Sequence, residues 1–154
     1  MDIKRFIIGT VVGGITLFIL GYVIFELAFA DFFAANAGSA TGAWKDPQVI
    51  WAIALGTLSY AALITLALGT RAGSTTIVEG LKVGAIVGFL MWFGADMIIY
   101  GVWNLSNLTA TIADSLLELI RAGISGAVIA AVLGKIAGAQ EDTHTDAQED
   151  TQTE

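Results

Sequence analysis

Four long stretches of the chain are apolar on every side, and hydrophilic segments separate them. They cover residues 6–27, 49–68, 83–102 and 115–136. A helix of about 20 apolar residues crosses a hydrocarbon layer of about 30 Å. A transmembrane β-strand would be shorter and would alternate apolar and polar residues, unlike these stretches. The pattern therefore predicts an all-α membrane protein with a four-transmembrane-helix bundle in residues 1–138.

The basic residues beside the apolar stretches predict the orientation of the bundle. The side that carries both termini has five of them, and the other side has only Lys45: the five are Lys4, Arg5, Arg71, Lys82 and Lys135. Because cytoplasmic loops of membrane proteins are enriched in Lys and Arg, both termini are predicted to be cytoplasmic. The predicted location is the cell membrane, crossed several times.

The first apolar stretch has one alternative interpretation, a cleaved signal peptide. Lys4 and Arg5 resemble a basic leader, and Ala28 and Ala30 before Asp31 resemble a cleavage site. The stretch is longer than the roughly 7 to 15 apolar residues of a usual leader. We therefore expect a retained helix, and an N-terminus at Asp31 in the purified protein would contradict this.

Composition agrees with a membrane protein and narrows its chemistry. The chain is 56% hydrophobic, with no cysteine, and its mean hydropathy is +0.77. It lacks the zinc-protease, P-loop, dinucleotide-binding and serine-hydrolase motifs, and it has no basic patch for nucleic acid. We therefore expect neither an enzyme with catalytic residues nor a cofactor, a metal site or a nucleic-acid partner. The lipid bilayer is the expected surrounding.

Residues 139–154 differ from the rest of the chain. They hold six of the fourteen acidic residues and no Lys or Arg, and they read as a near-duplicate of eight residues, "AQEDTHTD" and "AQEDTQTE". Such a segment has too little apolar surface to offset the entropy of ordering. It is predicted to be a disordered acidic tail, with His144 in solvent.

Small residues at a spacing of four predict where the helices touch. Transmembrane helices approach closely at such positions. Gly80, Gly84 and Gly88 open the third stretch, and the fourth carries a matching series: Ala122, Gly126, Ala130, Gly134 and Gly138. These two stripes are predicted to face each other, and Gly9 and Gly13 offer a further contact within the chain or between copies of it.

Ionisable residues within the apolar stretches or directly beside them are the candidate functional site, because each costs several kcal/mol in hydrocarbon unless it is paired or hydrated. They are Glu26, Asp96, Asp114, Glu118 and Arg121. The last three share one helix face with Ser125, and that face is predicted to point inward.

A depth estimate predicts how these charges pair. At about 1.5 Å per residue, Asp96 and Arg121 each lie about 20 Å from the cytoplasmic boundary. We therefore predict an Asp96–Arg121 ion pair with Glu118 beside it and with Tyr100 bonding into the cluster. Glu26 and Asp114 are predicted to lie at the outer rim.

Two interpretations of this cluster stay open. In one, the ion pair only fixes the hairpin of the third and fourth helices. In the other, the excess of acids leaves a carboxylate free to exchange protons or bind a cation, as in a proton-coupled transporter or a cation pathway.

The connections between helices carry further signals. Pro47 is predicted to lie in the first turn of the second helix. Asn104 and Asn107 match the glycosylation pattern, but in so short a loop they are expected to cap a helix and to bond within the loop.

Three segments carry a resemblance: "FADFFAANAGSATG", "EGLKVGAIVGFL" and "YGVWNLSNLT". Through them the chain, over residues 1–137, resembles a family of small bacterial inner-membrane proteins with four helices. The resemblance implies that fold and location and no activity. The chain differs from small multidrug transporters, whose essential Glu lies in the middle of the first helix, whereas Glu26 lies near its outer end.

The expected function is therefore that of a membrane protein that binds or moves a small ion or solute through the charged cluster in the outer half of the bundle. The alternative is an accessory or structural subunit of a larger membrane complex, or a homo-oligomer, that packs through its glycine stripes.

Overall fold

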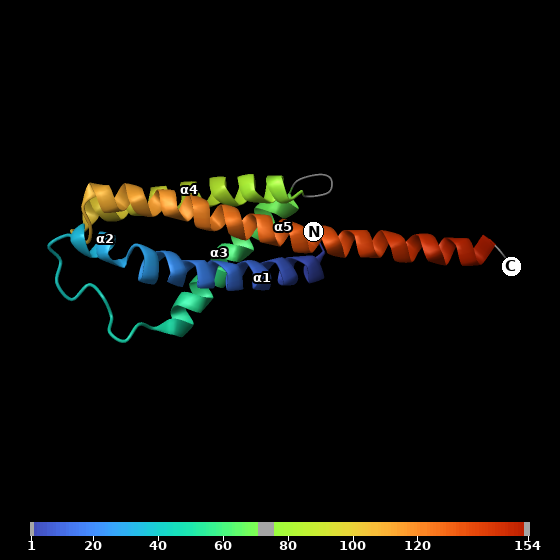
Figure 1. Ribbon diagram of the computed structural model, residues 1–154, viewed down its shortest axis with the longest axis horizontal. Coiled ribbons are helices and arrows are strands. Elements are labelled where there is room, and N and C mark those ends of the chain that lie inside the picture. The colour runs from blue at the N-terminus through green and yellow to red at the C-terminus, as the bar shows by residue number, and fades with distance from the viewer. Residues whose placement is uncertain (1, 71–75, 153–154) are drawn as a thin grey trace.

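The structure is an all-α bundle. This computed structural model describes residues 2–70 and 76–152, and side chains as far as residue 136. In order, its elements are α1 (Ile3–Gly21), the π-helix η1 (Tyr22–Ala28), α2 (Ala30–Ala35), α3 (Ile50–Gly69), α4 (Ile77–Val102) and α5 (Leu108–Gln152) (Figure 1).

Four segments in the described part of the chain are long and apolar enough to cross a membrane: Ile3–Ala28, Ile50–Gly69, Ile77–Val102 and Leu108–Ile136. The predicted all-α four-helix bundle is therefore confirmed. By the length and composition of these helices, the chain is a multi-pass integral membrane protein.

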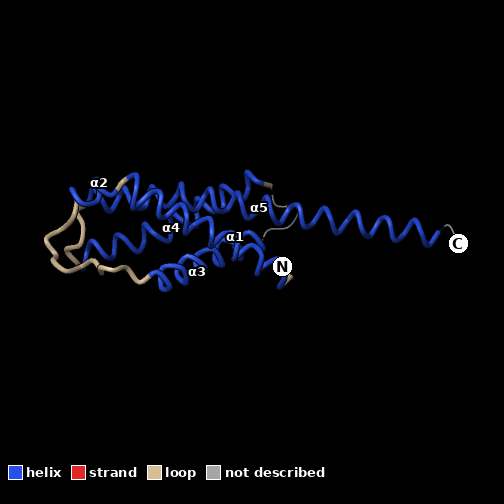
Figure 2. The backbone as a smooth tube through the Cα atoms, turned by 60° about the horizontal axis from the view of Figure 1, so that its bottom comes forward, coloured by secondary structure: helices blue, strands red, loops and turns tan. Residues whose placement is uncertain are grey.

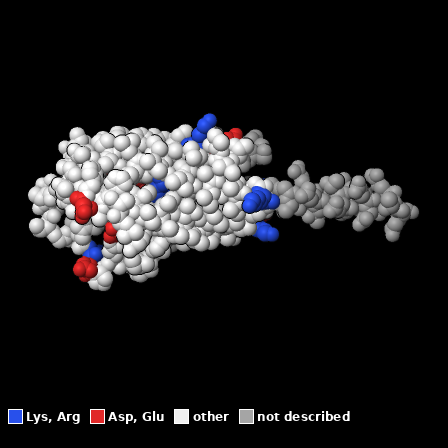
Figure 3. Space-filling model, in the orientation of Figure 1, with Lys and Arg blue, Asp and Glu red and all other residues white. Residues whose placement is uncertain are grey.

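The four long helices form two pairs, α4 with α5 and α1 with α3, which meet where α1 contacts α5. Helices α4 and α5 lie side by side along most of their length, α1 packs on α5, and α3 crosses α1 at an angle (Figures 1 and 2). We call the end where α1 and α4 begin the basic end, because Lys and Arg gather near it, and the opposite end the loop end (Figure 3). Arg71, one of the predicted cytoplasmic cations, lies outside the described residues.

The close contact between α4 and α5 depends on the predicted glycines. A methyl group at Gly84 would overlap the carbonyl oxygen of Ala122, and one at Gly80 would overlap that of Gly126. Gly88 lies against Ala122 and the backbone of Glu118. The predicted facing of the two stripes is confirmed for these residues, which set the register of the hairpin.

Gly134 does not belong to this contact, and its inclusion in the stripe was wrong. It is exposed. The helices are antiparallel and Ala130 faces Gly80, so Gly134 lies level with residue 76, where α4 has not yet begun. Gly9 and Gly13 pack inside the chain, since methyl groups there would lie 2.6 Å from Thr65 Cγ2 and from Ile129 Cδ1 respectively.

Two helices begin earlier than the apolar pattern predicted, because polar residues cap them. Thr76 and Glu79 form a capping box at the start of α4, where the prediction placed residue 83. Asn107 Oδ1 accepts from the Ala110 N–H at 3.0 Å and starts α5, predicted to begin at residue 115. Pro47 precedes α3 by three residues, so its predicted place in the first turn was wrong.

The acidic tail continues α5 as a helix to Gln152, where the sequence predicted disorder (Figure 1). A helix that is already formed extends without a new nucleation cost, which the prediction from composition did not include. The tail side chains lie outside the described ones.

At the loop end, residues 36–40 pair with residues 104–107, and we call this pairing the clasp. The Gly38 N–H donates to Leu105 O at 2.8 Å, and the Asn107 N–H donates to Asn36 O at 3.0 Å. The side chain of Asn107 donates to Asn36 Oδ1 at 2.9 Å, and that of Asn104 bonds to the Ser39 hydroxyl. The predicted capping by Asn107 and the loop bonding by both asparagines are confirmed.

Candidate functional site

A cavity of about 510 Å³ lies between the four long helices toward the loop end. Five of the six residues predicted for the charged cluster line it: Glu26, Asp96, Asp114, Glu118 and Arg121. They come from η1, α4 and α5, so the fold gathers charges that are far apart in the sequence. Tyr100 is not among the lining residues, and its side chain is 44% exposed, so the prediction that it joins the cluster was wrong.

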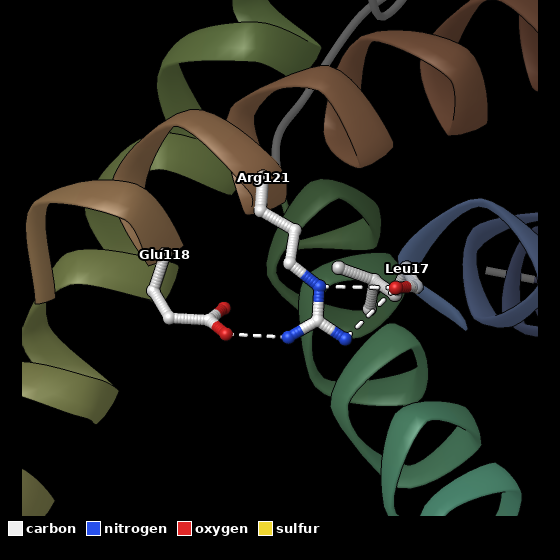
Figure 4. Close-up of polar contacts among 3 residues, drawn as sticks. All are labelled: Leu17, Glu118 and Arg121. Atoms are coloured by element: carbon white, nitrogen blue, oxygen red, sulfur yellow. Dashed lines mark hydrogen bonds and ion pairs between the residues drawn. The ribbon is translucent and has the colours of Figure 1, made fainter. Parts of the chain in front are cut away.

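Arg121 is the buried cation of this cavity. Its Nε and Nη2 both donate to the carbonyl oxygen of Leu17 on α1, at 3.0 and 2.8 Å, and its Nη1 pairs with Glu118 Oε1 (Figure 4). The ring of Phe25 lies 5.8 Å from the guanidinium carbon. Arg121 thus joins α5 to α1 through the Leu17 carbonyl and to η1 through the ring of Phe25, and it pairs with a carboxylate of its own helix.

The end of the first membrane helix is shaped around this guanidinium. A methyl group at Gly21 would lie 2.8 Å from Arg121 Nη2, so the glycine leaves room for the arginine. The next seven residues form the π-helix η1, in which the Phe29 N–H donates to Ile24 O at 2.9 Å. π-helical turns inside α-helices are frequent at functional sites. No sequence signal marked η1, and only the glycine at position 21 could have indicated that another side chain lies close to the backbone there.

The predicted Asp96–Arg121 ion pair does not form. Gly88 packs against the backbone of Glu118, so Asp96, eight residues further along α4, lies about two turns nearer the loop end than Glu118. Asp96 instead accepts from the Ser115 hydroxyl at 3.0 Å. The depth estimate failed because α4 begins six residues before the apolar stretch, which shifts its register against α5.

Among the described residues that line the cavity, Trp92 and Glu118 each have a buried polar atom without a hydrogen-bond partner, and Glu118 is the ionisable one. Its side chain is 2% exposed, Oε1 pairs with Arg121, and Oε2 has no hydrogen-bond partner. The buried hydroxyl of Tyr60 also has no partner within hydrogen-bond geometry, although it lies close enough to Glu118 to interact with it electrostatically. Buried polar atoms almost always have a partner, so an unpaired carboxylate oxygen beside a cavity indicates a place for a donor or a cation.

Of the two remaining acids, Glu26 lies at the rim, as predicted, whereas Asp114 lies deeper in the cavity. Glu26 is exposed and accepts from Gln48 Nε2 at 2.8 Å, which ties η1 to the segment before α3. Asp114 is half-buried and in electrostatic contact with Asp96 and Glu118. Sequence reasoning missed Leu17, Ser115 and Gln48, because a backbone carbonyl or a common polar side chain gives no pattern.

Toward the basic end the helices are closely packed. The core there consists of fully or nearly fully buried apolar side chains: Ile64, Leu68, Ile129 and Leu133. Ser125 donates its hydroxyl to Gly13 O at 3.2 Å and closes the gap between α1 and α5. The cavity therefore ends near Arg121 and does not continue through the bundle.

No protein-family model, curated protein or solved structure matches the chain. The predicted membership of a family of small bacterial inner-membrane proteins therefore stays a prediction.

Proposed function

We propose that this membrane protein binds a small cationic solute, or takes part in moving one, at the cavity near its loop end. The observation that carries the proposal is Glu118, whose buried Oε2 has no partner beside a cavity lined by four carboxylates and one guanidinium. A cation in the cavity would reduce the repulsion among these acids.

The side of the membrane that this cavity faces follows from the charge distribution. Lys4, Arg5, Lys82 and Lys135 lie toward the basic end, which the positive-inside rule assigns to the cytoplasm. We therefore place the cavity in the outer half of the bundle, in the bacterial inner membrane that the resemblance implies. A ligand would enter from outside, and transport would require the close packing toward the basic end to open.

The proposal is tested by thermal unfolding of the purified protein in mild detergent. Sodium, potassium, magnesium and tetramethylammonium chlorides are compared with sodium acetate and phosphate at equal ionic strength. At about 100 times its dissociation constant, a ligand of the native state adds about 2.7 kcal/mol. We therefore expect at least one cation to raise the Tm by roughly 5 °C in a saturable way, and the replacement of chloride by acetate or phosphate at constant sodium to leave the Tm unchanged.

Three variants localise the effect. Asp114→Asn and Glu118→Gln should each reduce the rise in Tm, whereas Asp31→Asn, an exposed carboxylate that does not line the cavity, should leave it unchanged. A rise that is equal in all variants would contradict the proposal. If no cation acts and a membrane protein copurifies in a fixed ratio, the alternative role as an accessory subunit is favoured.

A further inference from the structure

We infer that the solute is a monovalent organic cation, an ammonium group that carries apolar substituents. This inference rests on the proposed function and specifies its ligand. It follows from the chemistry of the cavity wall, from the spread of the acids and from the way in which the chain holds its own buried guanidinium.

The wall of the cavity is mainly apolar and includes four aromatic rings. Phe25 comes from η1, Phe33 from α2, Trp44 from the segment before α3 and Trp92 from α4. Phe25 and Phe33 are in contact, with ring centroids 5.6 Å apart. Aromatic faces attract cations, and they also shelter the apolar groups attached to an ammonium nitrogen.

The arrangement of the acidic side chains suits a ligand with a single positive charge rather than a coordinated metal ion. In the part of the chain that the structure describes, no three His, Cys, Asp or Glu side chains converge closely enough to hold a metal ion. Hard divalent ions need about six to eight oxygen ligands. Asp96 accepts from Ser115 and Glu26 accepts from Gln48. Asp114 has two acids as neighbours, and Glu118 Oε2 is buried without a hydrogen-bond partner.

Arg121 shows that this site already holds an organic cation. Its guanidinium pairs with Glu118 and lies 5.8 Å from the Phe25 ring centroid. A carboxylate with an aromatic face is the same pair of partners that an alkylammonium ligand needs. The carboxylate of Asp114 and the ring of Trp92, which both line the cavity, would repeat this arrangement for a ligand.

The test is calorimetric titration of the purified full-length protein with choline and with 3,3-dimethylbutan-1-ol, which has the same shape and no charge. Sodium and magnesium chlorides serve as inorganic probes at equal ionic strength. We expect saturable binding of choline and none of the neutral alcohol. Trp92→Leu keeps apolar volume without the aromatic face and should weaken choline binding roughly tenfold. Trp103→Leu, which lies outside the cavity lining, should leave it unchanged.

Each outcome separates this inference from the proposed function. Binding of sodium or magnesium without choline would overturn the organic-cation inference and keep a cation-binding protein. Equal binding of choline and the alcohol would overturn both. Asp114→Asn provides a second variant, since its side chain is only half-buried and asparagine has nearly the same shape, and it should also weaken choline binding. Choline affinity that is unchanged in both Trp92→Leu and Asp114→Asn would overturn the assignment to this cavity.

Discussion

Gly84→Ala is expected to destabilise the bundle by about 2 kcal/mol, although alanine is the better helix former by as much as about 1 kcal/mol. The added methyl group would overlap the carbonyl oxygen of Ala122, and a backbone atom cannot turn aside as a flexible side chain can. Helices α4 and α5 must then separate along their whole contact. Unfolding in mild detergent, followed by circular dichroism, measures the loss.

Gly94→Ala is the matched control for this change. Gly94 lies on the same helix, is exposed, and has no atom within 4 Å of an added methyl group. Its replacement should therefore be neutral or stabilising. Equal stability of Gly84→Ala and Gly94→Ala would show that α4 and α5 do not pack at this distance.

Arg121→Gln is expected to cost about 3 to 5 kcal/mol, because it leaves Glu118 buried without its cation. The loss should be much smaller in a chain that already carries Glu118→Gln. A double-mutant cycle on Glu118 and Arg121 should therefore give a coupling energy of roughly 2 kcal/mol.

The cycle on Asp96→Asn and Arg121→Gln is the comparison. Asp96 bonds to Ser115 and lies about two turns from Glu118 along the bundle, so its coupling to Arg121 should be clearly smaller. A larger coupling for Asp96 than for Glu118 would mean that the predicted ion pair forms after all. In that case the cavity would have a different arrangement of charges.

The number of helices and their main contact could be predicted from sequence, because each depends on local features. A run of apolar residues long enough for a bilayer defines each of the four spans, and Gly80, Gly84 and Gly88 mark where another backbone approaches. Both features can be interpreted without knowledge of the rest of the fold. The prediction for Gly134 was wrong only because α4 does not extend as far as the level of Gly134.

The pairing of the buried charges could not be predicted in the same way. It depends on the register between α4 and α5, which shifted when the capping box extended α4 to Ile77. It also depends on the Leu17 carbonyl, since backbone acceptors leave no trace in the residue pattern. The cavity itself depends on the tilt of α3 and on η1, neither of which has a periodic signal.

Because the chain contains no cysteine, single cysteines report on the cavity without background. The most direct test compares Ala110→Cys, a buried position that lines the cavity, with Thr41→Cys in the exposed connection before α3. The two labels are methanethiosulfonates of similar size, one with a trimethylammonium group and one with a sulfonate. Rates are measured on the purified protein in mild detergent.

At Ala110→Cys, the ratio of the labelling rate of the cationic reagent to that of the anionic reagent should be at least about tenfold higher than at Thr41→Cys, because a negative cavity concentrates cations. Asp114→Asn in the Ala110→Cys chain should reduce that preference. No reaction at Ala110→Cys, or the same preference at both positions, would contradict a cavity that is open at the loop end and selects cations.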